Sequence, residues 1–234
     1  MPTQSSGIYG GRDPLDIPAY TFTEAARYLR LPLATVRVWS LGQRYETAAG
    51  GKKSQPLIEI ADVSALSFRN VIELHVLSSI RRKHRVKMKA VRSALQFLKR
   101  QLNIQHPLAA QEMVTDGKDL FIERYGKLVN ISSGGQLEMK HVVDAYLARI
   151  ERDARGLPIR LFPFTRTQLE GAPKSIAMSP TVQFGRPCIA GTGIATSVIA
   201  ERYHAGESHE KLAEDYEQEI IAIEEAIRIE TQAA

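Results

Sequence analysis

Apolar residues recur at helical spacing in two short segments of residues 20–42, on either side of Pro32. The apolar positions are Ala25, Ala26 and Leu29 in the first segment and Leu33, Val36 and Trp39 in the second. Pro32 prevents one continuous helix because it lacks an N–H donor, and Thr23 is placed to cap the first helix. Ala26 is small and Val36 is branched, so these two residues can pack where two short helices cross steeply. The pattern predicts a helix-turn-helix, whose second helix enters the major groove of DNA.

We expect residues 33–41 to form the recognition helix. The turn position that often holds glycine is Arg30 or Leu31 here, and a left-handed non-glycine residue costs about 1 kcal/mol. Two amphipathic helices joined at a proline also occur in ordinary helical proteins, so a purely structural interpretation stays open. The outward face would carry side chains that can bond bases or phosphates, namely Thr35, Arg37, Ser40, Gln43 and Arg44.

A turn-rich stretch follows this segment and precedes a short apolar alternation at residues 56–60, which predicts a strand. The pattern predicts a hairpin, or wing, with Lys52 and Lys53 at its tip. The tip is where a winged helix-turn-helix contacts backbone phosphates. Two lysines are equally typical of an ordinary solvated loop, so the hypothesis depends on the neighbouring elements.

Two longer helices are expected next, over about 64–79, capped by Asp62 or Ser64, and over about 86–103, with a continuous apolar stripe. Residues 81–89 between them form the densest cationic run of the chain. Such a run is usually a solvated helix end, but its nearness to the helix-turn-helix and the wing favours phosphate contacts. The candidate contacts in this run are Arg81, Arg82, Lys83 and Arg85.

Residues 106–170 are expected to form a mixed α/β connecting region. Asp116 and Gly117 separate two apolar triplets, which predicts a hairpin over about 113–122. His106 has no other candidate ligand near it in sequence, and no metal spacing or nucleophile motif is apparent. Three further elements are expected, a strand over 128–131, a helix face over 142–150 and an edge strand over 157–164.

The tail begins with an extended, hairpin-like piece over about 182–190. Gly191 and Gly193 predict a tight turn rather than a phosphate loop, because no lysine follows them. Three helices are expected after this turn, over about 196–204, 208–216 and 218–231. The last helix carries a candidate dimer or partner interface formed by Ile220, Ile223 and Ile227.

The charged residues are distributed unevenly along the chain. The net charge of +5 divides into +10 over residues 1–105, zero over 106–170 and −5 over 171–234. A basic first half favours nucleic acid, whereas the acidic surface of residues 207–230 would repel phosphates. The three expected helices of the tail are also helix-turn-helix-like. Of the two such segments, only residues 20–42 therefore have the charge to face DNA. The acidic tail could bind a cationic patch on a partner, serve in dimerisation, or be merely solvated.

The expected fold class is mainly α with small β-hairpins, in two domains. Cys188 is the only cysteine, which excludes an intramolecular disulfide and fits a reducing compartment. No secretory signal and no apolar run of about 20 residues is apparent, so we expect a cytoplasmic protein. No cofactor is indicated, and an enzyme is disfavoured. The expected divisions are an arm (1–19), a DNA-binding domain (20–105), the connecting region (106–170) and a small three-helix domain (171–234).

Both ends of the chain resemble known families. The residues Tyr20, Glu24-Ala25-Ala26, Tyr28-Leu29, Thr35-Val36-Arg37 and Trp39 resemble the start of a MerR-type winged helix. The stretch from Gly185 to Ile194 resembles the Gly-x-Pro-x-Ile-x-Gly-Thr-Arg-Ile pattern of a small three-helix domain long described as of unknown function. Gly206, Ser208, Glu210 and Tyr216 match the pattern that follows it. Gly193 stands where that family has arginine, which puts any role of the arginine in doubt.

The combination of both halves resembles a VapB-type antitoxin, the partner of a VapC toxin with a PIN nuclease domain. The resemblance implies neutralisation of this toxin by direct binding, operator DNA binding as a homodimer, and repression of the antitoxin's own operon. It implies no membrane partner. The alternative is a stand-alone transcriptional regulator without a toxin, gated by an effector through the middle third. A PIN-domain gene next to this one would separate the two hypotheses.

Overall fold

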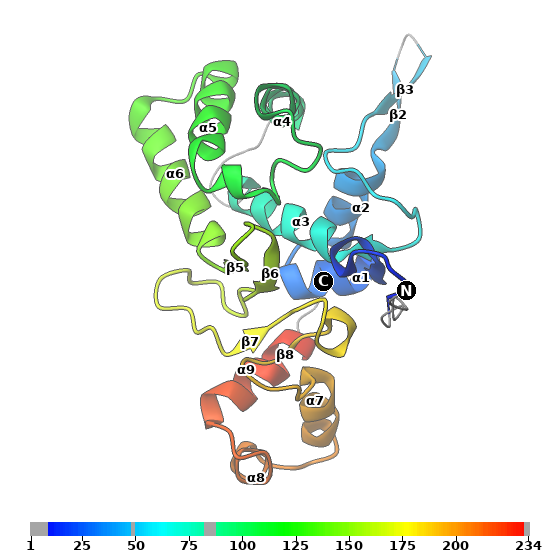
Figure 1. Ribbon diagram of the computed structural model, residues 1–234, viewed down its shortest axis with the longest axis vertical. Coiled ribbons are helices and arrows are strands. Elements are labelled where there is room, and N and C mark those ends of the chain that lie inside the picture. Colours follow the sequence, from blue (N-terminus) through cyan, green and yellow to red (C-terminus); the bar gives the residue numbers. More distant parts are fainter. Residues whose placement is uncertain (1–8, 48–49, 82–87, 232–234) are drawn as a thin grey trace, which may run out of the picture.

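The structure is a computed structural model that describes residues 9–47, 50–81 and 88–231. The fold class is confirmed as mainly α with small hairpins (Figure 1). The helices are α1 (Phe22–Leu29), α2 (Leu33–Leu41), α3 (Phe68–Arg81), α4 (Met88–Leu102), α5 (Asp116–Val129), α6 (Ser133–Leu147), α7 (Thr196–His204), α8 (His209–Asp215) and α9 (Ile220–Thr231). Short 3-10 turns lie at η1 (Pro14–Asp16), η2 (Gln111–Met113) and η3 (Gln183–Gly185).

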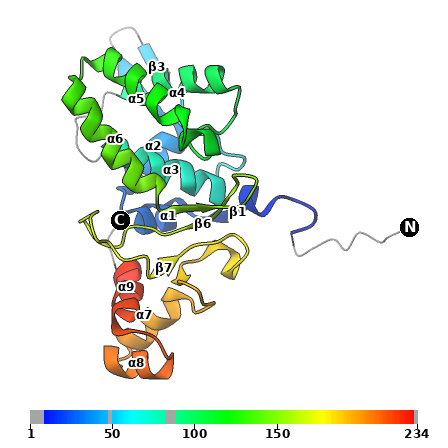
Figure 2. The ribbon, with the colours of Figure 1, turned by 60° about the vertical axis from the view of Figure 1, so that its left-hand side comes forward.

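Eight short strands pair two by two in the described ranges, always antiparallel. The pairs are β1 (Pro18–Tyr20) with β4 (Leu66–Ser67), β2 (Gln43–Thr47) with β3 (Gly50–Ser54), β5 (Ile150–Arg152) with β6 (Pro158–Leu161), and β7 (Ile176–Ala177) with β8 (Cys188–Ile189). Figure 2 shows β6 and β7 between the helices of the upper part and α7 to α9 below them. No described helix is both long and apolar enough to cross a membrane.

Helix α3 runs through the middle of the molecule (Figure 1) and is buried over almost its whole length, from Phe68 to Ile80. Its buried hydroxyls are satisfied locally, since Ser78 and Ser79 donate to carbonyl oxygens three residues back at 2.7 and 2.6 Å. The expected start near residue 64 is wrong. Asp62 accepts the Ser64 N–H at 2.8 Å within a loop, and the helix begins only after β4.

Helix α6 packs against α3, α5 packs against α6, and α4 packs against α5. Helix α4 confirms the apolar stripe expected from the sequence. The buried positions of α4 are Ala90, Val91, Ala94, Leu95 and Leu98. Their spacing of three and four residues places them on one face, which turns toward the core. The helix expected over 142–150 is confirmed up to Leu147, where α6 ends, but Ile150 belongs to strand β5. The edge strand expected over 157–164 is confirmed as the shorter β6.

The hairpin expected over 113–122 is wrong, because Asp116 and Gly117 begin helix α5. A Cβ atom on Gly117 would lie 2.8 Å from the Glu112 carbonyl oxygen, so the glycine serves close packing rather than a turn. The strand expected over 128–131 is also wrong. Asn130 ends α5 in the left-handed conformation, and the Ser132 hydroxyl then caps α6 by accepting the Gly135 N–H at 3.2 Å.

The three tail helices are confirmed as α7, α8 and α9, and η3 and β8 occupy the extended piece before them. The proposed interface on α9 needs correction. Ile223 is fully buried and Ile227 is 6% exposed, because both pack into the chain's own core, whereas Ile220 is 45% exposed. Of the three isoleucines, only Ile220 is open to a partner.

The expected arm is partly a packed element. Residues 1–8 lie outside the described part, but Leu15 in η1 is buried and the Arg69 Nε atom lies 2.6 Å from the Asp16 carboxylate. One continuous core cluster contains buried residues from Leu15 to Ile229. The division into two domains stays a prediction.

Candidate nucleic-acid interface

Helix α1 begins with a reciprocal cap rather than with the expected Thr23. The Thr21 hydroxyl accepts the Glu24 N–H at 3.1 Å, and the Glu24 carboxylate accepts the Thr21 N–H at 2.8 Å. This pair satisfies two N–H groups that the helix start leaves without intrahelical partners. Thr23 lies inside the first turn, so its assignment as the cap is wrong.

The turn between α1 and α2 places Arg30 in the left-handed conformation, with φ of 55° and ψ of 41°. The sequence singled out this position because glycine often occupies it. The Arg30 guanidinium donates to the Thr165 carbonyl oxygen at 3.0 Å and to the Thr167 hydroxyl at 3.1 Å. Two hydrogen bonds of about 1 kcal/mol each are enough to offset the cost of the strained backbone.

Helices α1 and α2 cross where the sequence predicted, since Ala26 and Val36 are both completely buried. The same packing makes Ser40 a wrong assignment for the outward face. Ser40 lies one helical turn beyond Val36, on the same buried face, and is 2% exposed. Arg37 lies on the opposite, exposed face of α2, as expected.

The β2–β3 hairpin leaves directly from the end of α2 and projects away from the body (Figure 1). Gly42 makes this junction possible, because its φ is +76° and a Cβ atom would lie 2.2 Å from the Ser54 carbonyl oxygen. The Leu57 N–H donates to the Trp39 carbonyl oxygen at 2.7 Å, so the chain leaving the hairpin is fixed to α2.

The wing differs in detail from the prediction. Gln43 and Arg44 are exposed but belong to β2, not to the helix face. Lys52 and Lys53 lie within β3, paired in register with Tyr45 and Arg44, and not at the tip. Their side chains fall outside the described part. No strand is present over residues 56–60 in the described chain. Leu57 and Ile58 lie there in an irregular segment, and both side chains are buried in the core.

Arg81 connects the end of α3 to α2 by donating a hydrogen bond to the half-buried Thr35 hydroxyl. The cationic run therefore begins beside α2. Arg82, Lys83 and Arg85 lie outside the described residues. Sequence analysis missed Arg92 on α4, which donates twice to the Gln55 carbonyl oxygen, at 3.0 and 2.7 Å, at the base of the hairpin. The only indication in the sequence was that Arg92 lies outside the apolar stripe of this helix.

The tail of the chain packs against α1 through α9 and holds it through polar contacts. The buried Tyr20 hydroxyl donates to the Gly185 carbonyl oxygen at 2.8 Å, and Arg186 forms an ion pair with Glu24. Gly185 has a φ of +87°, and a Cβ atom there would lie 2.0 Å from the Tyr20 hydroxyl oxygen. The Gly-x-Pro motif of the tail is thus a docking point for the helix-turn-helix.

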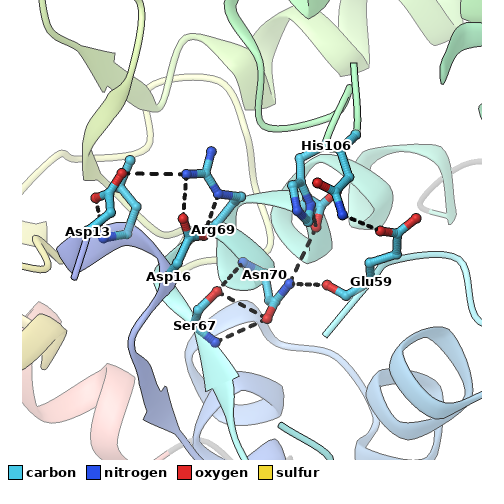
Figure 3. Close-up of polar contacts among 10 residues, drawn as sticks. Asp13, Asp16, Glu59, Ser67, Arg69, Asn70 and His106 are labelled. Atoms are coloured by element: carbon cyan, nitrogen blue, oxygen red, sulfur yellow. Dashed lines mark hydrogen bonds and ion pairs between the residues drawn. The ribbon is translucent and has the colours of Figure 1, made fainter. Parts of the chain in front are cut away.

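A second polar cluster lies at the other end of α3 (Figure 3). Glu73 is buried, which raises the pKa of its carboxyl, and its Oε2 atom lies 3.2 Å from His106 Nδ1. Asn70 donates to the Glu59 carbonyl oxygen at 2.7 Å. Sequence analysis left His106 without neighbours, and the fold brings it to Glu73 across 33 residues.

This cluster borders a cavity of about 730 Å³, but its charged groups are paired with one another. Arg69 holds Asp16 through two hydrogen bonds of 2.6 and 2.9 Å, which lowers the pKa of that carboxyl. No group of three potential metal ligands occurs among the described side chains. The cluster therefore fixes the N-terminal segment and the 104–106 loop to α3.

The chain is similar to known proteins in sequence and in fold. A family model described as "Protein of unknown function (DUF433)" matches residues 176–228. A protein of Mycobacterium tuberculosis (strain ATCC 25618 / H37Rv) described as "Putative antitoxin VapB45" is 28% identical over 221 residues, which cover 86% of this chain and 89% of the relative. The chain is similar to this protein over nearly its full length.

Two further comparisons concern the same organism. "Uncharacterized protein Rv2308" is 26% identical over 222 residues, covering 91% of this chain and 90% of the relative. The crystal structure of Rv2018 superposes with a TM-score of 0.65 at 22% identity, covering 91% of this chain and 99% of the other. At this identity the match establishes a shared fold.

Proposed function

We propose that this chain is an antitoxin that binds DNA as a homodimer, represses its own operon, and neutralises a PIN-domain ribonuclease toxin by direct binding. The observation that carries the proposal is the exposed Arg37 on α2 together with the hairpin fixed to the end of that helix. Similarity to "Putative antitoxin VapB45" over 86% of this chain supports the same function.

For DNA binding, a dimer would present two copies of α2 to successive major grooves, about 34 Å or 10 base pairs apart. Arg37 is the leading candidate for a base or phosphate contact. Arg44 and the lysines of β3 would hold the backbone and so fix the register. Ser40 has no part in this contact because it is buried.

For toxin binding, we propose the exposed edge of the tail that contains Glu217, Glu219 and Ile220. Two other acids of the tail, Glu225 and Glu230, are paired within the chain. Glu225, which is fully buried, lies between Arg166 and Arg228, and the Glu230 carboxylate lies 2.9 Å from Arg27. The exposed carboxylates of Glu217 and Glu219, beside the exposed Ile220, suit a partner with a cationic rim around an apolar patch.

The test has a DNA arm and a toxin arm. The purified chain should shift a fragment of its own promoter, and Arg37→Ala should weaken this binding while Arg155→Ala should not. A PIN-domain protein encoded beside this gene should co-purify with the chain, and Glu217→Lys/Glu219→Lys should release it. Binding to the promoter without any co-purifying toxin would favour the alternative, a stand-alone transcriptional regulator. Failure of both arms would overturn the proposal.

A further inference from the structure

A cavity of about 340 Å³ lies directly behind the turn of the helix-turn-helix, between that turn, α3, α6 and the segment around residues 164–167. It is separate from the proposed DNA contact of Arg37 and from the acidic edge of the tail. The lining residues that matter for binding are Arg30, His75, Arg81, Tyr146, Phe164 and Arg166.

The inner wall of this cavity is aromatic and buried. The rings of Tyr146 and Phe164 lie 4.8 Å apart between centroids, and His75 stacks on Phe164 at 6.0 Å with planes inclined by 15°. Burial lowers the pKa of His75 to about 4, so its ring is neutral near pH 7. Its Nε2 atom lies 3.0 Å from the Tyr146 carbonyl oxygen and therefore carries the ring proton. The wall thus offers flat, uncharged surfaces.

The rim of the cavity is cationic. Among the described lining residues three are arginines and none is a carboxylate. Arg81 donates to the Thr35 hydroxyl, Arg30 donates to the oxygens of Thr165 and Thr167, and Arg166 pairs with Glu225 behind the rim. Guanidinium groups have donors in a fixed fork that matches a carboxylate.

We propose that this cavity binds a small compound that carries a carboxylate on a flat apolar body. The flat body would lie against Tyr146 and Phe164, and the carboxylate would lie between Arg30 and Arg81. The volume is at the lower end of ligand pockets, which suits a single aromatic ring with a short substituent. The proposal goes beyond the proposed function, because ligand binding requires neither DNA nor toxin.

The position of the cavity gives the ligand access to the recognition helix. Arg30 forms the left-handed turn before α2, and Arg81 donates to Thr35 on α2 itself. A ligand carboxylate that binds Arg81 would compete with the Thr35 hydroxyl for the same guanidinium group. Two sites that share one side chain are energetically coupled.

The first test uses the unmodified full chain and titration calorimetry with benzoate as the probe. Benzoate should bind one to one with saturation below about 10 mM. Benzamide, which has the ring without the charge, and inorganic phosphate, which has the charge without the ring, should each bind at least tenfold more weakly. Absence of saturable benzoate binding, or equal binding of benzamide or phosphate, would overturn the proposal.

The second test places the ligand. Arg30→Gln and Arg81→Gln should each weaken benzoate about tenfold, the usual loss for one charge-assisted hydrogen bond. Arg155→Gln is the matched control, because this exposed arginine lines the other cavity, and it should leave the affinity unchanged. Equal losses in all three variants would reject the placement. Thermal melting identifies variants that fail to fold, and the comparison of benzoate, benzamide and phosphate decides the proposal without them.

Discussion

The Nη2 atom of Arg27 on α1 lies 2.9 Å from the carboxylate of Glu230 on α9, across 203 residues of sequence. The Glu230 side chain is only 8% exposed, and it also accepts a hydrogen bond of 2.5 Å from the Thr196 hydroxyl. The tail is therefore attached to α1, the helix that packs against α2. A change in the tail can reach the proposed DNA-binding surface through this contact.

Arg27→Ala should lower the free energy of unfolding by about 1–3 kcal/mol, because it leaves the Glu230 carboxylate buried without its cation. Urea denaturation followed by circular dichroism measures the change. Arg155→Ala removes an ion pair in which the arginine is 78% exposed, and it should change stability by less than about 0.5 kcal/mol. Equal stabilities of both variants and the parent would show that the α1–α9 contact contributes nothing.

Gly42→Ala should destabilise the chain by about 2–4 kcal/mol and weaken DNA binding. The added Cβ atom would lie 2.2 Å from the Ser54 carbonyl oxygen at a φ of +76°, so the hairpin would have to move away from α2. Gly134→Ala is the matched control, because Gly134 lies in the first turn of α6 with nothing within 4 Å of the added atom. It should stabilise by about 0.5–1 kcal/mol. A neutral Gly42→Ala would contradict the fixed hairpin.

Predictions from the sequence were most accurate in segments where helical periodicity dominates. The stripe of α4 from Ala90 to Leu98 and the crossing of Ala26 with Val36 follow from helical spacing alone. The prediction failed at Asp116-Gly117, because the same dipeptide can form a hairpin turn or start a helix, and only the close approach of the Glu112 carbonyl decides between them. A short sequence motif does not determine its own secondary structure where a tertiary contact decides between a turn and a helix.

The candidate site was predictable in part. Arg37 and Ser40 are both polar residues of one helix, and only their phase relative to Val36 separates the exposed one from the buried one. That phase was available in the sequence. The contact of Tyr20 with Gly185 was not, because it joins positions 165 residues apart. The aromatic cavity around Phe164 likewise comes from distant segments, so no spacing could reveal it.

The chain should lose stability in mild acid through His75. Burial lowers its folded-state pKa to about 4, whereas the unfolded value is 6.5. The unfolded state therefore binds more protons between these values, so this contribution is complete above pH 6.5 and is lost as the pH falls toward 4. We expect a loss of about 2 kcal/mol from this residue between pH 7.5 and pH 5.

His75→Gln isolates this contribution, because glutamine can donate to the Tyr146 carbonyl oxygen but does not titrate. Unfolding free energies of parent and variant, measured from pH 7.5 to 4.5, should converge or cross as the pH falls. Parallel curves would show that His75 is not the titrating group.

The contact between Arg81 and Thr35 leads to two separable effects on DNA binding. Arg81→Ala removes the hydrogen bond to Thr35 and also a cation beside the proposed DNA-binding helix, whereas Thr35→Val removes only the hydrogen bond. Both variants should weaken binding to the chain's own promoter. Arg81→Ala should also make the slope of log K against log salt concentration shallower by about 1, because one fewer phosphate is neutralised.

Thr35→Val should leave that salt slope unchanged, because no charge is lost. The double variant should bind no more weakly than Arg81→Ala alone if Thr35 acts only through Arg81, since the shared hydrogen bond cannot be lost twice. Additive losses would mean that Thr35 contacts DNA by itself. An unchanged salt slope for Arg81→Ala would instead assign Arg81 to positioning the recognition helix, and would leave phosphate contact to Arg37, Arg44 and the hairpin.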